Sequence, residues 1–113
     1  MKSHQTLAKH ILDRIVQIEQ YAQNVSKEEF LNNFMIQDAV VRNLEIIGEA
    51  SRNINPEIKE RFPDIPWRDI IAMRNKLVHE YFSGDSETVW NVVKLDLADL
   101  KRYANQLLSF NEK

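Results

Sequence analysis

The sequence predicts an all-α fold, an up-and-down bundle of four main helices joined by short helical turns. Only two glycines and three prolines interrupt the 113 residues, and no segment alternates apolar and polar residues over the length of a strand. Apolar residues instead recur at steps of three and four, the spacing of one face of a helix. No repeat, low-complexity tract or linker divides the chain, so we expect one domain spanning residues 1–113.

The first predicted helix follows Ser3, whose hydroxyl is suited to cap it, and runs for about six turns. The residues of its apolar face are Leu7, Ile11, Ile15, Ile18, Ala22 and Val25. Ser26 and Glu29 then form the pattern of a capping box, which predicts a short second helical segment.

A long central helix is predicted from about Phe34 to Ile54, where Asn55-Pro56 ends it. Its buried residues are expected to be Val40, Leu44, Ile47 and Ala50. Proline is favoured at the first position of a helix, so Pro56 can start a short helical turn.

Pro66 can open the third long helix for the same reason. The apolar residues of that helix are Trp67, Ile70, Ile71, Leu77 and Val78. Ser83-Gly84-Asp85 is the clearest loop in the chain, and one continuous last helix is expected from about Ser86 to Phe110. The inward residues of that last helix are expected to be Val89, Val93, Leu97, Leu100, Ala104 and Leu107.

Composition excludes several kinds of site. The chain has no cysteine, which rules out disulfides and thiolate metal ligands.

No apolar run approaches the ~18 residues of a membrane span, and the N-terminus lacks the apolar stretch of a secretory signal, so we expect a cytoplasmic protein without a membrane partner. His4 and His10 lie six residues apart, a poor spacing for chelation, and are expected at the surface. We predict no metal site and no cofactor, and no phosphate-binding glycine loop is present.

The segment from Met73 to Phe82 concentrates the reactive side chains. It reads Arg74, the polar Asn75, three further residues, His79, one further residue and Tyr81. This spacing resembles the Arg-polar-x-x-x-His signature of HEPN-fold ribonucleases, and the added tyrosine matches the HepT-like minimal subgroup. Three more blocks resemble that subgroup in the same order, at residues 42–50, 62–68 and 89–90, so the similarity covers roughly residues 35 to 100. The Arg and His spacing alone is a weak pattern, whereas the four ordered blocks together are specific.

The resemblance implies a HEPN-like fold and a metal-independent endoribonuclease that works as a homodimer on RNA, with no DNA substrate expected. It also implies a type VII toxin–antitoxin system, in which a nucleotidyltransferase antitoxin neutralises the toxin by adenylylating the tyrosine of the motif, here Tyr81. The alternative is a catalytically silent HEPN module that only binds a nucleotidyltransferase or a nucleotide. Retention of Arg74, His79 and Tyr81 together favours the enzyme.

The motif residues also suit this chemistry by their own properties. Cleaving RNA without a metal needs a group that removes the 2′-hydroxyl proton and a cation that stabilises the phosphorane. Histidine has an unperturbed pKa of ~6.5, so His79 can serve as general base or acid near neutral pH. Arginine offers a planar, permanently charged group that matches phosphate oxygens, which suits Arg74 to the second role.

Helix geometry predicts how these side chains are arranged. At ~100° per residue, Asn75 lies almost above His79, so its amide could orient the imidazole. Arg74 and His79 are ~140° apart by the same arithmetic, so they do not share a face of one helix. A second subunit would bring two Arg–His pairs to one cleft. Tyr81 is seven residues after Arg74 and should return to its side.

Structural roles are open for each of these residues. Arg74 could form an ordinary surface ion pair, and His79 could interact with the C-terminal end of the helix dipole. Tyr81 could simply close the end of the bundle, and Asn75 could be a polar residue without a catalytic role.

The central helix carries a polar stripe whose role the sequence leaves open. The stripe consists of Asp38, Arg42, Glu45, Glu49 and Arg52. It is either a solvated, ion-paired face or the lining of a cleft near the catalytic helix. Gly48, in the same helix, costs ~1 kcal/mol relative to alanine, and we expect it to permit a close approach between helices.

Charge limits how the protein can hold RNA. The net charge is −2 and the pI is about 5.9, whereas proteins that cover many phosphates usually have a basic face or a high pI. We therefore expect weak, local contact with RNA and no broad electrostatic capture.

Overall fold

The structure is a computed structural model that describes residues 2–82 and 84–111. Within those residues the chain forms helices and no strands, which confirms the all-α prediction. The helices are α1 (His4–Ala22), α2 (Lys27–Leu31), α3 (Phe34–Arg52), α4 (Pro56–Arg61), α5 (Trp67–Phe82), α6 (Ser86–Leu95) and α7 (Leu97–Ser109).

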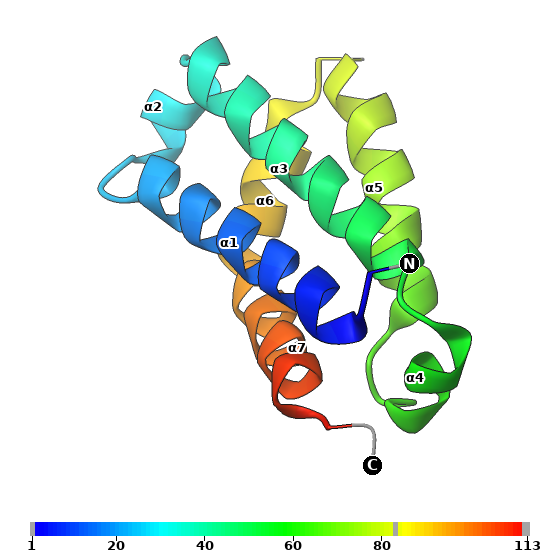
Figure 1. The fold of residues 1–113 in the computed structure, drawn as a ribbon. Helices are drawn as coiled ribbons and strands as arrows, with labels where there is room; N and C mark the ends of the chain where they lie inside the picture. Colours follow the sequence, from blue (N-terminus) through cyan, green and yellow to red (C-terminus); the bar gives the residue numbers. More distant parts are fainter. Residues whose placement is uncertain (1, 83, 112–113) are drawn as a thin grey trace.

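Helix α3 occupies the middle of the bundle (Figure 1). It packs against α1 on one side and α5 on the other, and α1 also packs along α7. Helix α6 lies behind this layer in Figure 1 and contacts α2, α3 and α5. The two ends of the described chain meet, because the His4 ring nitrogen Nε2 lies 2.8 Å from the carbonyl oxygen of Phe110. Helix α5 packs mainly on α3 and α6, so it lies at an edge of the layer.

Local capping residues begin the helices where the sequence predicts. Ser3 accepts a hydrogen bond from the Thr6 amide at the start of α1. Ser26 and Glu29 form the expected capping box of α2. Asn55 caps α4 with Pro56 in its first turn. These contacts satisfy amides that have no partner inside the helix, and they explain why the boundaries can be read from the sequence.

The predicted last helix is wrong in one respect, because the structure divides it at Asp96 into α6 and α7. The amide of Asp96 still donates to the carbonyl of Val92 at 2.9 Å, so the chain bends there without losing its hydrogen bond. The two parts pack on different neighbours: α6 on α2 and α5, and α7 on α1. Periodicity shows which face is buried but not the direction of the axis, and aspartate is a weak helix former at the bend.

One hydrophobic core joins the helices and includes a buried polar link. Its fully buried apolar side chains include Ile15, Ile18, Phe30, Val40, Leu44, Ile47, Leu77, Val89 and Leu107. Gln37 is also fully buried; its amide donates to the Phe30 carbonyl at 2.8 Å and accepts from the Ser86 hydroxyl at 2.9 Å. This side chain holds α2, α3 and the start of α6 together at one end of the bundle.

His4 corrects an expectation from the sequence. Its side chain is buried, with its ring 5.7 Å from that of Phe110, whereas we expected it at the surface. Its partner is 106 residues away, so no local pattern could reveal the contact.

Among the described helices, none is long and apolar enough to cross a membrane.

Candidate functional site

Helix α5 carries the whole predicted motif without a break. Its continuity from Trp67 to Phe82 keeps Arg74 and His79 five residues apart on one helix, which is ~140° around the axis and ~7.5 Å along it. His79 is exposed in the last turn. Only Ile70 and Leu77 of the described α5 residues are buried, while Trp67, Met73 and Tyr81 pack partly buried against the core.

The end of α5 is fixed by a tight reversal of the chain. Gly84 has φ +93°, a conformation that favours glycine, and its amide donates to the Tyr81 carbonyl at 2.9 Å. The Asp85 amide donates to the Glu80 carbonyl at 2.9 Å, which completes a Schellman-type ending. The Asp85 carboxylate then accepts from the amide and hydroxyl of Thr88, and these bonds lower its pKa. Ser83 of the expected loop lies outside the described residues.

Gly48 brings the backbone of α3 against the stem of Arg74. A Cβ atom built at Gly48 would lie 2.5 Å from Cβ and 2.8 Å from Cγ of Arg74, closer than real side chains approach. The absence of a side chain at position 48 therefore lets the two helices meet, as the sequence suggests for this glycine. The contact places the root of the Arg74 side chain at the α3–α5 crossing.

The guanidinium of Arg74 has an unused donor. Nη1 donates to the side-chain oxygen of Asn75 at 2.9 Å. Nε is buried and has no hydrogen-bond partner among the residues that the structure describes. A buried N–H group without a partner is costly, and an anion would satisfy it. Asn75 thus contacts the arginine of the motif; its expected action on the imidazole of His79 stays a prediction.

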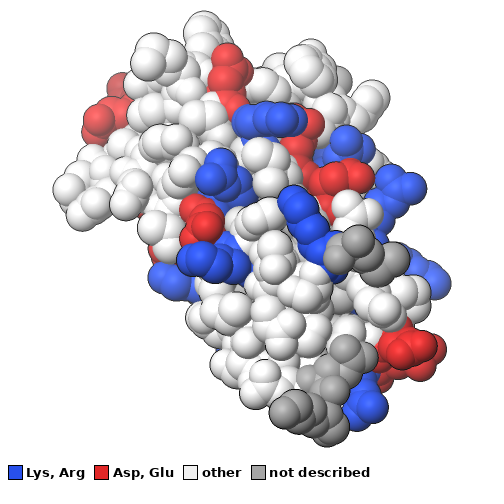
Figure 2. All heavy atoms as spheres, viewed as in Figure 1, with Lys and Arg blue, Asp and Glu red and all other residues white. Residues whose placement is uncertain are grey.

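A surface hollow of about 530 Å³ lies beside Arg74. All residues of the polar stripe except Asp38 line it. Its charged and imidazole side chains are Lys2, His10, Arg42, Glu45, Glu49, Arg52 and Arg74. Glu49 and Arg52 form an exposed ion pair at 3.9 Å, so part of the stripe is the solvated face considered above. Figure 2 shows basic and acidic side chains interleaved on this face of the molecule, with no broad basic surface in this view.

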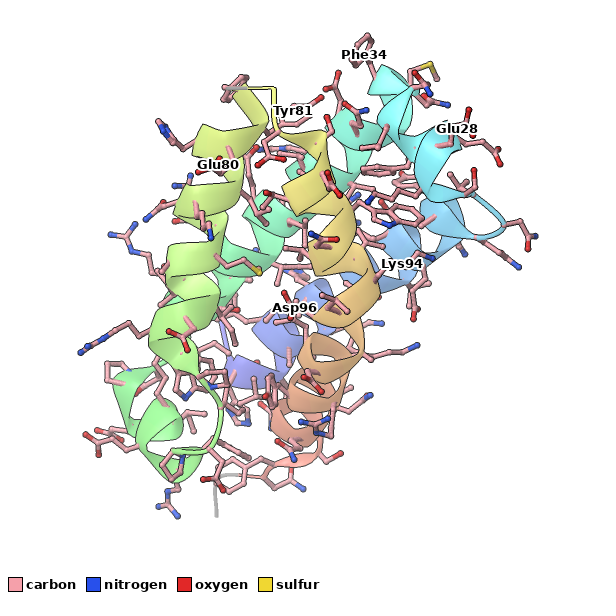
Figure 3. The ribbon with its side chains drawn as sticks, turned by 180° about the vertical axis from the view of Figure 1, so that it is seen from behind. Glu28, Phe34, Glu80, Tyr81, Lys94 and Asp96 are labelled. Carbon is pink, nitrogen blue, oxygen red and sulfur yellow. The ribbon has the colours of Figure 1, made fainter. Side chains whose placement is uncertain are left out.

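Tyr81 contacts the other end of α3. Its hydroxyl donates to the Asp38 carboxylate, and the structure brings these residues together from positions 43 apart. Three causes raise the pKa of Tyr81 from 10.0 to about 12: burial of the phenol, its hydrogen bond to Asp38 and the nearby negative charge of Asp38. Figure 3 labels Tyr81 at the end of the bundle where α5 finishes and α3 begins. The sequence singled out Asp38 only as a member of the stripe, and nothing in its spacing indicated this partner.

Three large apolar side chains are exposed at the same end of the bundle. Phe34 and Met35 are 75% and 83% exposed in the first turn of α3, and Phe82 is 80% exposed beside Tyr81.

Among the described residues, no group of three or more histidine, aspartate or glutamate side chains is arranged to hold a metal ion.

Comparison with known proteins identifies the family of the chain. The family model described as "Ribonuclease HepT-like" matches residues 11–107. The chain belongs to the HepT-like ribonuclease family. The match includes α3, α5 and α6, and therefore the crossing at Gly48, the motif and the Asp38–Tyr81 contact.

Several relatives carry names that agree with this family. A protein of Thermococcus cleftensis named "Probable ribonuclease HepT" is 43% identical over 100 residues, which cover 88% of this chain and 91% of that protein. A protein of Methanocaldococcus jannaschii named as a candidate RNase is 42% identical over 92 residues, covering 81% and 84% of the two chains. Another such protein, from Caldanaerobacter subterraneus, is 32% identical over 108 residues, or 96% of each chain. No solved structure matches the chain.

Proposed function

We propose that this HepT-like protein is a metal-independent endoribonuclease toxin that cleaves RNA as a homodimer. The observation that supports the proposal is the position and the hydrogen bonding of the Arg74 side chain. Its stem is held against α3 at Gly48, while its buried Nε lacks a partner in the described part of the chain. The same helix presents His79 in its exposed last turn. A fixed cation with an unused donor and a nearby histidine are the groups that phosphodiester cleavage requires.

The reaction begins with the ribose on the 5′ side of the cleaved bond. His79 accepts the proton of the 2′-hydroxyl, whose oxygen attacks the adjacent phosphorus. The new O2′–P bond gives a phosphorane, and Arg74 stabilises its extra negative charge through charge-assisted hydrogen bonds. The P–O5′ bond then breaks, a protonated imidazole gives its proton to O5′, and the products are a 2′,3′-cyclic phosphate and a 5′-hydroxyl.

A second copy of the chain accounts for the separation of the two groups. Arg74 and His79 are ~140° apart around α5, so one helix does not direct both at the same phosphate. Helix α5 is an edge of the bundle with few buried side chains, which leaves room for another α5 beside it. Two facing copies would supply two arginines, two histidines and hence both a base and an acid.

We further propose that a nucleotidyltransferase antitoxin silences the toxin by transferring adenylyl groups from ATP to Tyr81. Its hydroxyl is the acceptor, and the half-buried ring lies on the same helix as Arg74 and His79. The added nucleotide is a bulky anion on the side of α5 that carries Arg74, and it can extend along the helix toward the site where the substrate phosphate must bind. Inhibition of this kind requires no change of fold.

RNA cleavage by purified protein in excess EDTA tests the enzymatic proposal. Products should end in a 2′,3′-cyclic phosphate or a 3′-phosphate, and His79→Ala should lower the rate by ~10²–10⁴-fold. Arg74→Ala should also lose activity, whereas Arg68→Ala, an exposed arginine six residues earlier on α5, should retain it. Circular dichroism should show that the variants keep their helices.

Two results would contradict this assignment. The first is full activity of the His79→Ala protein, and the second is strict dependence on a divalent ion. Absence of cleavage by the wild-type protein on mRNA and tRNA alike would favour the silent module that binds a nucleotidyltransferase or a nucleotide.

A further inference from the structure

The hydrogen bond between Tyr81 and Asp38 is not used by the RNA-cleavage mechanism. It joins the last turn of α5 to the first half of α3 through two side chains that are open to solvent on one side. Asp38 is exposed, Tyr81 is half-buried, and the phenolic proton points at a carboxylate oxygen. A nucleophilic hydroxyl held against a base in this way is the arrangement that group-transfer sites use to activate an acceptor.

We propose that Asp38 is the general base that accepts the phenolic proton when Tyr81 is adenylylated. This inference rests on the proposed function, in which Tyr81 is the acceptor. It adds that the toxin chain itself supplies a catalytic residue for its own modification, in addition to those of the nucleotidyltransferase.

The chemistry of the phenol explains why a base is needed. A pKa of about 12 means that roughly one Tyr81 in 10⁵ is ionised at neutral pH, so the nucleophile is the neutral hydroxyl. As the Tyr81 oxygen bonds to the α-phosphorus of ATP, the bond from that phosphorus to the bridging oxygen of the β-phosphate breaks and pyrophosphate leaves. The phenolic proton passes to the Asp38 carboxylate and then to water. The hydrogen bond already places donor and acceptor for this transfer.

The product also fits the position of Asp38. The adduct has no phenolic proton to donate, and its phosphodiester is negatively charged, so the carboxylate now repels it. Arg74 lies seven residues earlier on the same helix, within ~20° of the same face and ~10.5 Å along the axis. Repulsion from Asp38 and attraction to Arg74 therefore both move the nucleotide toward the groups that cleave RNA.

Other carboxylates do not offer the same geometry. The carboxylate that the structure records in contact with the Tyr81 hydroxyl belongs to Asp38. On α3, Arg42 follows one turn later and Glu45 almost two turns later. On α5, His79 and Glu80 precede Tyr81 directly and point in other directions around the helix.

The test measures adenylylation of the full-length protein by the nucleotidyltransferase, using ATP labelled at the α-phosphate. Asp38→Asn retains an oxygen that can accept the Tyr81 hydrogen bond but cannot take the proton at neutral pH. It should lower kcat for adenylylation by ~10²–10⁴-fold with little change in KM for ATP. Asp64→Asn, the same substitution at an exposed site in the turn before α5, should be modified like the wild type. Asp38→Glu should recover part of the rate.

The pH profile separates a base from a structural role. Without Asp38 the reaction depends on the small phenolate fraction, so the rate for Asp38→Asn should rise about tenfold per pH unit, while the wild-type rate stays flat above neutral pH. Ultraviolet absorbance should also show that the phenol of Tyr81 titrates at a lower pH in Asp38→Asn than in the wild type. Circular dichroism confirms that the variant is folded.

The outcomes distinguish this inference from the proposal on which it depends. If wild-type protein receives no nucleotide on Tyr81, the assigned mode of inhibition is wrong, and the role of Asp38 is wrong with it. If the wild type is modified on Tyr81 and Asp38→Asn is modified at the same rate with the same pH profile, only the role of Asp38 is overturned.

Discussion

At the scale of single residues, Arg74 and Tyr81 lie on nearly the same side of α5 but contact different parts of α3. Arg74 meets the backbone at Gly48, and Tyr81 donates to the carboxylate of Asp38. The guanidinium can therefore act on a phosphate while the phenol is held ten residues away along α3. Under the proposed function, this separation lets Arg74 serve cleavage while Tyr81 serves its control.

Tyr81→Phe should escape silencing by the nucleotidyltransferase. The substitution removes the acceptor hydroxyl but keeps the ring that lies 5.9 Å from Phe82. Loss of one partly exposed hydrogen bond should cost only about 0.5–1.5 kcal/mol of unfolding free energy. RNA cleavage is measured after incubation with antitoxin and ATP and removal of the antitoxin, since a tight complex would block the site sterically.

Mass spectrometry of the same samples identifies the modified position. Tyr103→Phe, at a half-buried tyrosine of α7, should still be silenced and should carry a nucleotide on Tyr81. A nucleotide on a residue other than Tyr81, or inhibition that outlasts antitoxin removal with no adduct, would refute this mechanism.

At the scale of the helices, the α3–α5 crossing positions the candidate site. The helices are antiparallel neighbours, with Gly48 against Arg74 near one end of their contact and Asp38 against Tyr81 near the other. The buried Gln37 and the reversal at Gly84 fix the end that carries Tyr81. A helix of which only Ile70 and Leu77 are buried is thereby held in place at several points along its length.

Gly48→Ala should destabilise the fold and reduce cleavage. Replacing a glycine inside a helix with alanine normally adds about 1 kcal/mol of stability. Here the new Cβ would lie 2.5 Å from Cβ of Arg74, so α5 or the Arg74 side chain must move, and such overpacking costs about 1–3 kcal/mol. Urea unfolding and the RNA-cleavage rate provide the two measurements. A Gly48→Ala protein that is more stable than the wild type and fully active would show that the close contact is unimportant.

At the scale of the whole molecule, the bundle leaves α5 at its edge. Its neighbours within the chain are mainly α3 and α6, and its exposed residues include His79 and Phe82. A single chain of 13.3 kDa therefore presents its arginine and histidine on different sides of an accessible helix. Pairing two such edges about a twofold axis is the simplest way to assemble both groups at one phosphate.

The proposed dimer makes a specific prediction for mixed proteins. Sedimentation should give about twice 13.3 kDa. If the reacting arginine and histidine come from opposite subunits, mixing inactive Arg74→Ala with inactive His79→Ala chains should restore part of the activity, because some mixed dimers contain one intact pair. Each variant mixed with itself serves as the control. A fully active monomer, by sedimentation and assay at the same concentration, would contradict the proposal.

The sequence by itself determined the helices, most of their boundaries and the place of the motif. These features depend on residues close together in the chain: Ser26 with Glu29 in a capping box, Asn55 with Pro56, and Arg74 with His79 on one helix. Spacing of three or four residues is enough to reveal such features, because the geometry of a helix fixes which side chains are neighbours.

Only the tertiary structure decided which distant residues meet. It set the bend at Asp96, buried His4 against Phe110, and brought Asp38 to Tyr81 across 43 positions of the chain. Helical periodicity gives the direction of a side chain around its own axis but not the angle or register between two axes. The close approach at Gly48 depends on that packing, which is why the sequence could suggest a small residue at a contact but not that Arg74 fills it.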